Sequence, residues 1–347
     1  MRVLFRADCS RSVGTGHLFR CREIARYFKD KGSDVCFVIN DYAFNKDIVA
    51  EFPYHTISYA DINEEITKTD LLLSRLKSDV IFVDFYDKSS NAGLMDVFHR
   101  NARQEVVALT DDYNKVCIAS DLLVACHPRQ VQYDYSGSGQ RVLAGEQFLV
   151  VSAEFMNAAV EVRPKAENVL VTFGGHDPDN VMHLIARSIA SGAQERDFSN
   201  MIVHFLVGGI YKFENQLRKF LEKTGLHSVF HKKLPSVLTL FKKTDIAITA
   251  GGNTLYELCR LGVPCIAVGL NRRQHEACRI LQERGLVEYA GYYTDIETKS
   301  LFSMLAGLLD SYDRRFSLHA QNIEHFKIDP LDVIYAVLTG ERYETTR

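Results

Sequence analysis

The sequence predicts an α/β protein made of two doubly wound, parallel-sheet domains, and three observations lead to that class. Short apolar strands alternate with helical stretches along the chain. The alternation begins again after a polar segment, residues 161–168, which contains a proline and is the best candidate for a linker between the domains. The 347 residues are also enough for two ordinary domains. We therefore expect an N-terminal domain over residues 1–160 and a C-terminal domain over residues 161–347. Ligands should bind in an interdomain cleft, at the carboxyl ends of the strands.

The first half contains continuous runs of Val, Ile, Leu and Phe, which are typical of parallel strands covered on both faces. Helical patterns lie between these runs, for example at His17–Lys31 and Glu64–Lys77. The expected strands of this half are Arg2–Ala7, Asp34–Asn40, Asp79–Phe85, Glu105–Thr110 and Leu122–Ala125.

The second half repeats the pattern of strand, glycine turn and helix. Its first strand runs into Gly174-Gly175, and a helix is expected at Asp179–Ser191. The chain after Thr298 is helical in pattern, and Asp329–Leu338 is expected to form a last helix. The expected strands of this half are Asn168–Phe173, Met201–Val207, Ser228–His231, Asp245–Thr249 and Pro264–Gly269.

Composition excludes several classes of function. A net charge of -3 without a dense basic patch argues against a nucleic-acid partner. No apolar run approaches the roughly 20 residues of a membrane span, so stable membrane insertion is not expected. Arg6 and Asp8 interrupt any signal-peptide pattern, and we expect a cytoplasmic protein. The eight cysteines are scattered without metal-ligand spacing, so no metal or other cofactor is expected.

The first glycine turn is Gly14-x-Gly16, and His17 opens the helix that follows. A glycine turn at a helix N-terminus suits an anion. The positive end of the helix dipole disfavours imidazolium, so a neutral ring is expected, able to take a proton beside a bound phosphate. Arg20 stands one turn further along. The alternative is a tight turn with a cap-region histidine. Dinucleotide binding is not expected, because the glycines come several residues after the strand and Phe19 stands at the place of the third glycine.

The second glycine turn, Gly251-Gly252, joins a strand to a helix. Paired glycines let backbone N–H groups approach a phosphate, and Asn253 and Thr254 can cap the helix and donate to phosphate oxygens. Glu257 lies one turn into the helix, where a carboxylate can accept from a ribose diol. The alternative, of equal weight, is a plain helix cap with Glu257 in a first-turn dipole role.

Further candidates follow other strand ends. Gly174-Gly175 forms a third glycine turn after a strand. Three such turns together are stronger evidence for phosphate binding than any one of them. Gln274 could contact a sugar or base, although a solvated helix start fits it slightly better. Tyr86 ends an Asp-Phe-Tyr run at the cleft edge or merely packs there. Asp111-Asp112 fits a turn better than a metal site.

Four motifs resemble those of the PseG/SpsG-like family and occur in the family's order over about residues 1–290. They are Arg6-Ala-Asp8, Gly14-x-Gly16-His17-x-x-Arg20-Cys21, Gly174-Gly175-x-Asp177-Pro178-x-Asn180 and Ala250-Gly251-Gly252-Asn253-Thr254-x-x-Glu257. The resemblance implies the GT-B fold of MurG-type glycosyltransferases, in which two Rossmann-like domains face a cleft. By analogy with that fold, the last helix is expected to return to the first domain.

The resemblance also implies an activity. Enzymic members of the family hydrolyse UDP-2,4-diacetamido-2,4,6-trideoxy-β-L-altropyranose at the anomeric carbon in pseudaminic acid biosynthesis, with inversion and without a metal. It implies His17 as the base that activates water and Tyr86 as an active-site tyrosine. The residues that it assigns to the substrate are Gly16, Arg20, Gly175, Gly251, Gly252, Asn253, Thr254, Glu257 and Gln274.

Departures from the family pattern at His127, Ser152 and His176 fall on the sugar-facing side by analogy, so they bear on the sugar more than on the nucleotide. The leading hypothesis is a UDP-sugar hydrolase. One alternative is a GT-B glycosyltransferase that moves the sugar to a surface-glycan acceptor. Another is a non-catalytic nucleotide-sugar-binding protein, which the presence of both His17 and Tyr86 disfavours.

Overall fold

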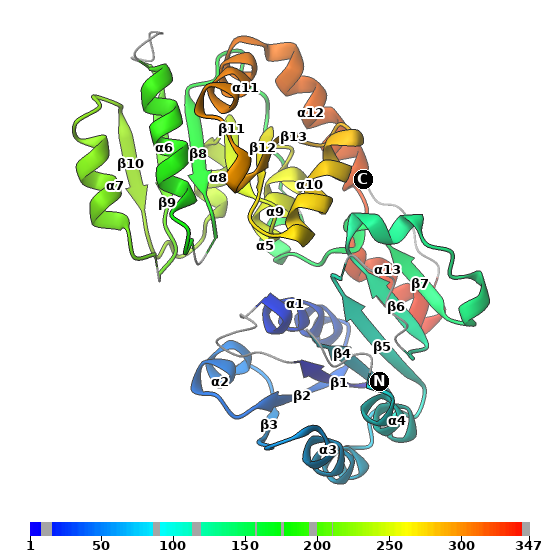
Figure 1. Ribbon diagram of the computed structural model, residues 1–347. Helices are drawn as coiled ribbons and strands as arrows, with labels where there is room; N and C mark the ends of the chain where they lie inside the picture. Colours follow the sequence, from blue (N-terminus) through cyan, green and yellow to red (C-terminus); the bar gives the residue numbers. More distant parts are fainter. Residues whose placement is uncertain are drawn as a thin grey trace. The chain divides into compact units, whose positions relative to one another are not determined.

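The computed structural model of residues 1–347 (Figure 1) describes residues 1–7, 16–85, 91–112, 119–156, 158–174, 177–193, 200–209 and 211–341. The chain forms two compact units, one made of Met1–Ser152 with Ile328–Arg347 and the other of Ala153–Lys327. None of the helices in these ranges is long and apolar enough to cross a membrane.

Unit 1 is built on a seven-stranded parallel sheet in the order β3-β2-β1-β4-β5-β6-β7. Its strands are β1 (Arg2–Ala7), β2 (Asp34–Asn40), β3 (Tyr54–Ile57), β4 (Val80–Asp84), β5 (Glu105–Thr110), β6 (Leu122–Ala125) and β7 (Arg141–Ala144). Its α-helices are α1 (Gly16–Asp30), α2 (Ala43–Val49), α3 (Ile62–Leu76), α4 (Ala92–Asn101) and α13 (Pro330–Thr339). The short 3-10 helices η1 (Pro128–Gln132), η2 (Ser136–Ser138) and η3 (Glu146–Phe148) complete the unit.

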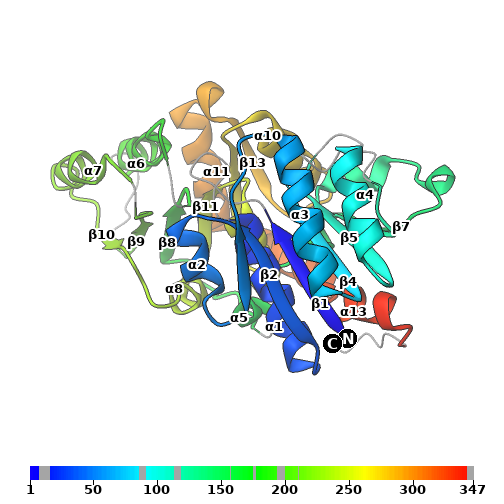
Figure 2. The same ribbon diagram turned by 90° about the horizontal axis from the view of Figure 1, so that it is seen from below.

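Aromatic side chains pack together on one face of the sheet of unit 1. Phe5 of β1 stacks on Phe37 of β2 and Phe82 of β4, with ring centroids 5.1 and 4.8 Å away. Phe28 of α1 covers Phe82, and Tyr335 of α13 packs on Phe28. Helices α3 and α4 lie side by side over the opposite face (Figure 2). The last helix therefore packs on α1, within the first unit.

Unit 2 holds a six-stranded parallel sheet in the order β10-β9-β8-β11-β12-β13. Its strands are β8 (Asn168–Thr172), β9 (Ile202–Leu206), β10 (Ser228–His231), β11 (Ile246–Ala250), β12 (Cys265–Gly269) and β13 (Glu288–Tyr292). Its helices are α5 (Ala153–Met156), α6 (Val181–Gly192), α7 (Glu214–Leu221), α8 (Leu238–Lys243), α9 (Asn253–Leu261), α10 (Arg272–Glu283), η4 (Tyr293–Asp295), α11 (Thr298–Asp310) and α12 (Tyr312–His325).

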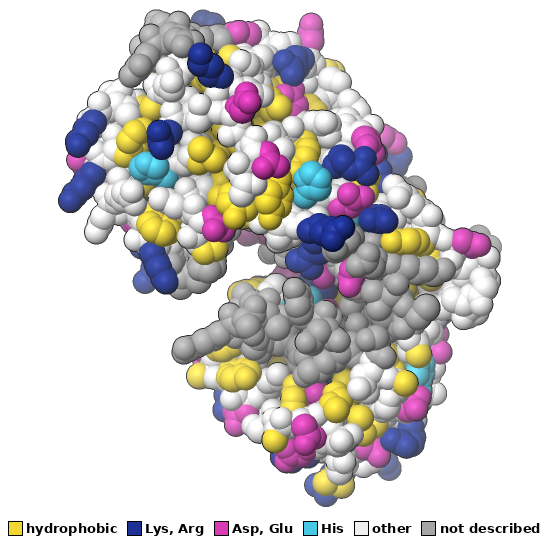
Figure 3. Space-filling view, viewed as in Figure 1, with side chains coloured by type: hydrophobic (Ala, Val, Ile, Leu, Met, Phe, Trp, Pro, Cys, Tyr) yellow, Lys and Arg dark blue, Asp and Glu magenta, His cyan; other side chains and the backbone are white. Residues whose placement is uncertain are grey.

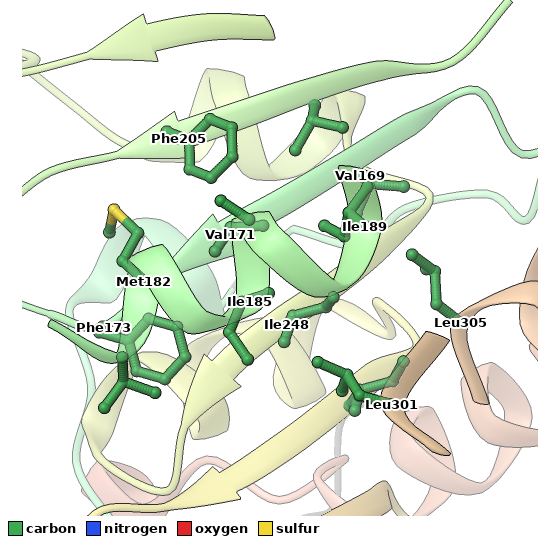
Figure 4. Packing of buried hydrophobic residues seen from close by; sticks show 14 of the residues in the cluster. Val169, Val171, Phe173, Met182, Ile185, Ile189, Phe205, Ile248, Leu301 and Leu305 are labelled. Atoms are coloured by element: carbon green, nitrogen blue, oxygen red, sulfur yellow. The ribbon is translucent and has the colours of Figure 1, made fainter. Parts of the chain in front are cut away.

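The core of unit 2 lies under α6 and α11. Side chains of the central strands, such as Val171 and Ile248, meet Ile185 of α6 and Leu301 and Leu305 of α11 (Figure 4). All five are at most 2% exposed, so each contributes about 1.5–3 kcal/mol by burial.

On the surface, basic and acidic side chains are interspersed over the visible face (Figure 3).

The prediction of two doubly wound parallel sheets is confirmed, and of the four edge strands only β10, also partly exposed, was predicted. Strands β3, β7 and β13, which the sequence did not predict, are all sheet edges. Their residues are mostly partly or fully exposed, so they lack the continuous apolar runs that mark buried strands.

The sequence placed the domain boundary at residues 160–161, whereas the compact units divide at Ser152 and again at Lys327. The polar segment 161–168 is bonded into unit 2 instead. Arg315 of α12 donates to the carbonyl oxygens of Arg163 and Pro164, both at 2.9 Å. Arg163 in turn reaches Asp245 at 2.6 Å. These bonds make the segment part of the second unit rather than a linker.

Candidate active site

The strand order of unit 1 brings His17 to Asp84. Strands β1 and β4 are neighbours, with Ala7 paired to Asp84 at their carboxyl ends. The chain returns to β2 on one side of β1 and continues through β5 on the other side of β4, so this is the switch point of the sheet. Helix α1 begins at Gly16 and presents His17 there, with Nδ1 2.7 Å from Asp84 Oδ1.

Arg20 completes this cluster from the next turn of α1. Its guanidinium grips Asp84 in a fork, with Nε 2.7 Å from Oδ2 and Nη2 2.6 Å from Oδ1. Burial alone would lower the pKa of Arg20 and raise the pKa of Asp84. The opposite charges outweigh burial, so the pKa of Arg20 is raised and that of Asp84 is lowered. Both groups are therefore ionised at neutral pH.

This pairing changes the expected role of Arg20. The sequence suggested that Arg20 faces the substrate, but its fork is directed at a buried carboxylate. A bidentate pair of this kind holds both partners in one geometry. The arrangement fits a role in ordering Asp84 and His17 better than a direct contact with a diphosphate.

The ionised carboxylate also decides which ring nitrogen of His17 carries hydrogen. A carboxylate only accepts hydrogen bonds, so Nδ1 must donate to Asp84 Oδ1 at 2.7 Å. The lone pair then lies on Nε2. An imidazole with its lone pair on Nε2 can accept a proton at that nitrogen.

The thiols beside this cluster are kept protonated. Burial, and next the Asp84 charge, raise the pKa of Cys21 well above its ordinary value. Burial raises the pKa of Cys126 to about 12. Neither thiol is a thiolate at neutral pH, so neither has the form of a cysteine nucleophile. Among the described residues of this cluster, His17 is therefore the candidate for acid–base chemistry.

The glycine turn between β11 and α9 is a second candidate site, in unit 2. The amide of Gly251 donates to Val268 O, and the amide of Gly252 donates to Ala250 O, at 3.0 and 2.8 Å. Helix α9 begins at Asn253, with neither a side-chain cap nor an acidic residue in its first turn among the described residues. The expectation that Asn253 or Thr254 caps the helix is therefore wrong. This helix terminus presents uncompensated N–H groups, which suits an anion.

Close packing explains why residue 251, the first of the pair before α9, is a glycine. A Cβ on Gly251 would lie 2.5 Å from Cys278 Sγ and 3.2 Å from the backbone oxygen of Gln274. Gln274 is thus brought against the turn, and its Nε2 would lie 3.6 Å from a Cβ on Gly252. Its Oε1 accepts from the amide of Leu270 at 3.1 Å. The structure therefore gathers Gln274 with the glycine pair that the sequence had singled out separately.

Glu257 lies one turn into α9 and is half-buried. Burial, with a further contribution from the charge of Glu154 on α5, raises the pKa of Glu257 to about 7. Glu154 accepts a hydrogen bond from Ser236 at 2.6 Å. This carboxyl group, with its pKa near 7, lies one turn from the open N-terminus of α9. When it is ionised, it can accept hydrogen bonds from hydroxyl groups.

The third glycine turn gives a different result. Asp177 is 4% exposed and accepts from the amides of Val181 and Met182, both at 2.9 Å. Its carboxylate therefore fills the N-terminus of α6, where an external phosphate was expected to bind. Gly175, Tyr86 and His176, singled out in the sequence, lie outside the described residues.

Sequence reasoning overlooked Asp84 as a functional residue and named it only as the neighbour of Tyr86. The signal that could have found it is positional: a carboxylate at the end of a buried strand, in a sheet whose order places that strand beside β1. Of the described site candidates, Gly16, His17 and Arg20 lie in unit 1, and Gly251, Gly252, Asn253, Thr254, Glu257 and Gln274 lie in unit 2.

Comparisons with known proteins bear on family and fold. No family model matches the chain. The chain is 23% identical over 323 residues to the spore coat polysaccharide biosynthesis protein SpsG of Bacillus subtilis, covering 92% of each protein. It is 24% identical over 264 residues to the UDP-2,4-diacetamido-2,4,6-trideoxy-beta-L-altropyranose hydrolase of Campylobacter jejuni, covering 73% of this chain and 90% of that enzyme.

Among solved structures, MurG from Acinetobacter baumannii superimposes with a TM-score of 0.74 at 11% identity, covering 98% of this chain and 100% of that one. At this identity the likeness concerns the fold alone. It confirms the GT-B architecture that the sequence motifs implied.

Proposed function

We propose that this chain, a PseG/SpsG-like protein with the GT-B fold, is an enzyme that uses water to cleave a UDP-sugar at its anomeric carbon. The observation that carries the proposal is the contact between His17 Nδ1 and Asp84 Oδ1 at the switch point of the first sheet. This contact supplies an imidazole with a defined basic nitrogen, which general base catalysis requires.

The proposed reaction has one displacement step. Nε2 of His17 takes a proton from a water molecule, whose oxygen forms a bond to the anomeric carbon. The bond from that carbon to the diphosphate oxygen breaks, and its electron pair leaves with UDP. The product is the free sugar with inverted configuration, and the proton on His17 returns to solvent. General base catalysis of this kind contributes about 10²- to 10⁴-fold.

The turn at Gly251-Gly252 is the proposed site of the diphosphate. The uncapped N-terminus of α9 offers backbone N–H groups and the positive end of the helix dipole. Glu257, when ionised, would accept from the ribose diol, and Gln274 lies close enough to the turn to contact the same ligand. Electrostatic stabilisation of the leaving diphosphate at such a terminus lowers the barrier to the bond-breaking step.

The proposed substrate is UDP-2,4-diacetamido-2,4,6-trideoxy-β-L-altrose, the sugar nucleotide in the name of the relative from Campylobacter jejuni. This would place the enzyme in pseudaminic acid biosynthesis. The second candidate is transfer of the sugar to a glycan acceptor, which is suggested only by analogy with the fold of MurG. The two reactions differ only in whether water or an acceptor hydroxyl attacks the anomeric carbon.

Phosphorus-31 NMR with this substrate, without an acceptor and in water enriched in oxygen-18, tests the proposal. We expect UDP to appear as substrate is lost, with the label in the sugar because the carbon–oxygen bond breaks. The His17→Gln variant should lose about 10²-fold or more in kcat. Label in the phosphate, or full activity in that variant, would contradict the mechanism. Binding without turnover until an acceptor is added would establish the transferase.

A further inference from the structure

The carboxylate of Asp84 is saturated by donors that come from α1. Oδ1 faces His17 Nδ1 at 2.7 Å and Arg20 Nη2 at 2.6 Å. Oδ2 accepts from Arg20 Nε at 2.7 Å and faces Cys21 Sγ at 3.8 Å. A carboxylate has about four lone-pair sites, so Asp84 is fully used by one turn of one helix. Its side chain has no exposed surface with which to meet a substrate.

We propose that Asp84 is a positioning residue that holds hydrogen on Nδ1 of His17 and so leaves the lone pair on Nε2, and that Arg20 serves to orient and neutralise Asp84 rather than to bind diphosphate. The kinetic consequence rests on the proposed function, whereas the state of the imidazole does not.

The geometry assigns the task to the carboxylate specifically. Nη2 of Arg20 lies 3.2 Å from Nδ1 of His17, because both converge on the same oxygen. Two donors can share Oδ1 only if that oxygen is a pure acceptor. An asparagine at residue 84 has one acceptor oxygen, so its NH2 group must face either Nδ1 of His17 or Nε of Arg20. In the first orientation the ring of His17 loses the contact that selects its tautomer. In the second orientation Arg20 loses one arm of its fork.

The role that we assign to Arg20 is to keep the carboxyl group of Asp84 ionised. Burial alone would raise the pKa of Asp84, and a protonated carboxyl group could donate to Nδ1 and reverse the tautomer. The planar fork of arginine prevents this by matching both oxygens at once. This accounts for the cation on the helix face beside His17 without any contact to a ligand.

The unit also contains a matched control. Glu65 of α3 is a fully buried carboxylate, paired with a buried arginine, Arg6, at 2.5 Å. It resembles Asp84 in burial and in partner. Its partner Arg6 lies on β1, whereas the donors to Asp84 lie on α1. Glu65→Gln therefore reproduces the loss of a buried charge without touching the imidazole.

The decisive measurement is nitrogen-15 NMR of the histidine rings in the whole chain, with His17→Gln used to assign the His17 signals. At pH 8 we expect the wild-type ring as the Nδ1–H tautomer. Asp84→Ala, which removes both oxygens, should shift it toward Nε2–H, and Glu65→Gln should leave it unchanged. An Nε2–H ring in the wild-type protein, or no change in Asp84→Ala, would overturn the inference. The wild-type spectrum decides even if Asp84→Ala does not fold.

Kinetics and binding then separate this inference from the proposed function. With the proposed substrate, Asp84→Asn should lower kcat by about 10²- to 10⁴-fold with KM within about threefold, and Glu65→Gln should leave both within about threefold. Arg20→Lys should leave UDP affinity within about threefold, whereas a tenfold loss would show that Arg20 binds diphosphate. If the wild-type enzyme releases no UDP, the proposed function fails, and the tautomer result still stands by itself.

Discussion

The two glycine turns of unit 2 show how similar sequence can give opposite chemistry at a helix N-terminus. The turn after β8 leads into α6, whose first amides are held by the carboxylate of Asp177 at 2.9 Å. The turn after β11 leads into α9, which has no side-chain cap among the described residues. Both strands lie at the switch point of the same sheet. A built-in anion occupies one terminus, so only the other is available to a ligand.

The largest expected effect concerns stability at the occupied terminus. Asp177→Ala leaves the buried amides of Val181 and Met182 without their acceptor. We expect a loss of about 2–4 kcal/mol in the free energy of unfolding, measured by urea denaturation. Asp177→Asn keeps one oxygen acceptor and should lose about half as much. UDP affinity should stay within threefold in the folded variants, and a larger fall would place phosphate at α6 after all.

The second effect concerns binding at the open terminus. Gly252 has a φ of -105°, and among the described residues an added Cβ would meet only Gln274 Nε2, at 3.6 Å. Gly252→Ala should therefore fold with a stability within about 0.5 kcal/mol of the wild type. If the turn cradles the diphosphate, the methyl group should weaken UDP binding by about tenfold or more, equivalent to about 1.4 kcal/mol, as measured by calorimetry.

Gly174 offers the matched control in the other turn. It has a φ of +71°, and no atom of the described residues lies within 4 Å of an added Cβ. Gly174→Ala should cost about 1–2 kcal/mol of stability through backbone strain and leave UDP affinity unchanged. The pair thus separates strain from ligand contact. Equal effects of the two variants on UDP binding would remove the distinction between the turns.

The difference between the turns could not be predicted from the motifs alone. Both have paired glycines after a buried strand, and polar residues follow each pair. What separates them is whether a side chain folds back onto the helix amides, which depends on loop conformation. Asn180, for example, adopts a left-handed φ of 55° before α6. The central strands were predictable because they are buried on both faces. Of the partly exposed edge strands, β3, β7 and β13 were missed and β10 was predicted.

The same limit applies to the cluster at His17. The sequence singled out His17 and Arg20 from their place at a helix start, but their partner Asp84 lies 67 and 64 residues away. Only the order of the strands, with β4 beside β1, brings this carboxylate to the helix. The spacing of a motif predicts contacts between residues that are close in sequence. This contact depends on the order of the strands in the sheet, which the spacing does not give.

A third effect concerns pH dependence at the open terminus. The pKa of Glu257 is raised to about 7, so the carboxyl group loses its charge as the pH falls through 7. It is about nine-tenths ionised at pH 8 and about one-tenth at pH 6. If the ribose diol needs the carboxylate, UDP should bind roughly tenfold more weakly at pH 6 than at pH 8.

Titration of UDP itself must be removed from that comparison. Glu257→Gln serves this purpose, because the ratio of its Kd for UDP to the wild-type Kd cancels protonation of the ligand. We expect the ratio to fall toward one as the pH decreases to 6. A ratio that does not vary with pH would separate Glu257 from nucleotide binding and leave it a first-turn residue of α9.

The smallest effect tests the cause of that raised pKa. Glu154 contributes less than burial does, and its carboxylate oxygen accepts from Ser236. Glu154→Gln removes the charge and keeps an oxygen acceptor, so the pKa of Glu257 should move down toward its ordinary value without reaching it. The pH at which UDP binding weakens should move down with it, seen as a gain of about two- to threefold in affinity near pH 6.5. Because α6 carries its own carboxylate, Asp177→Asn should leave this pH profile unmoved. A shift in that variant instead would show that the two helix termini are coupled and not independent.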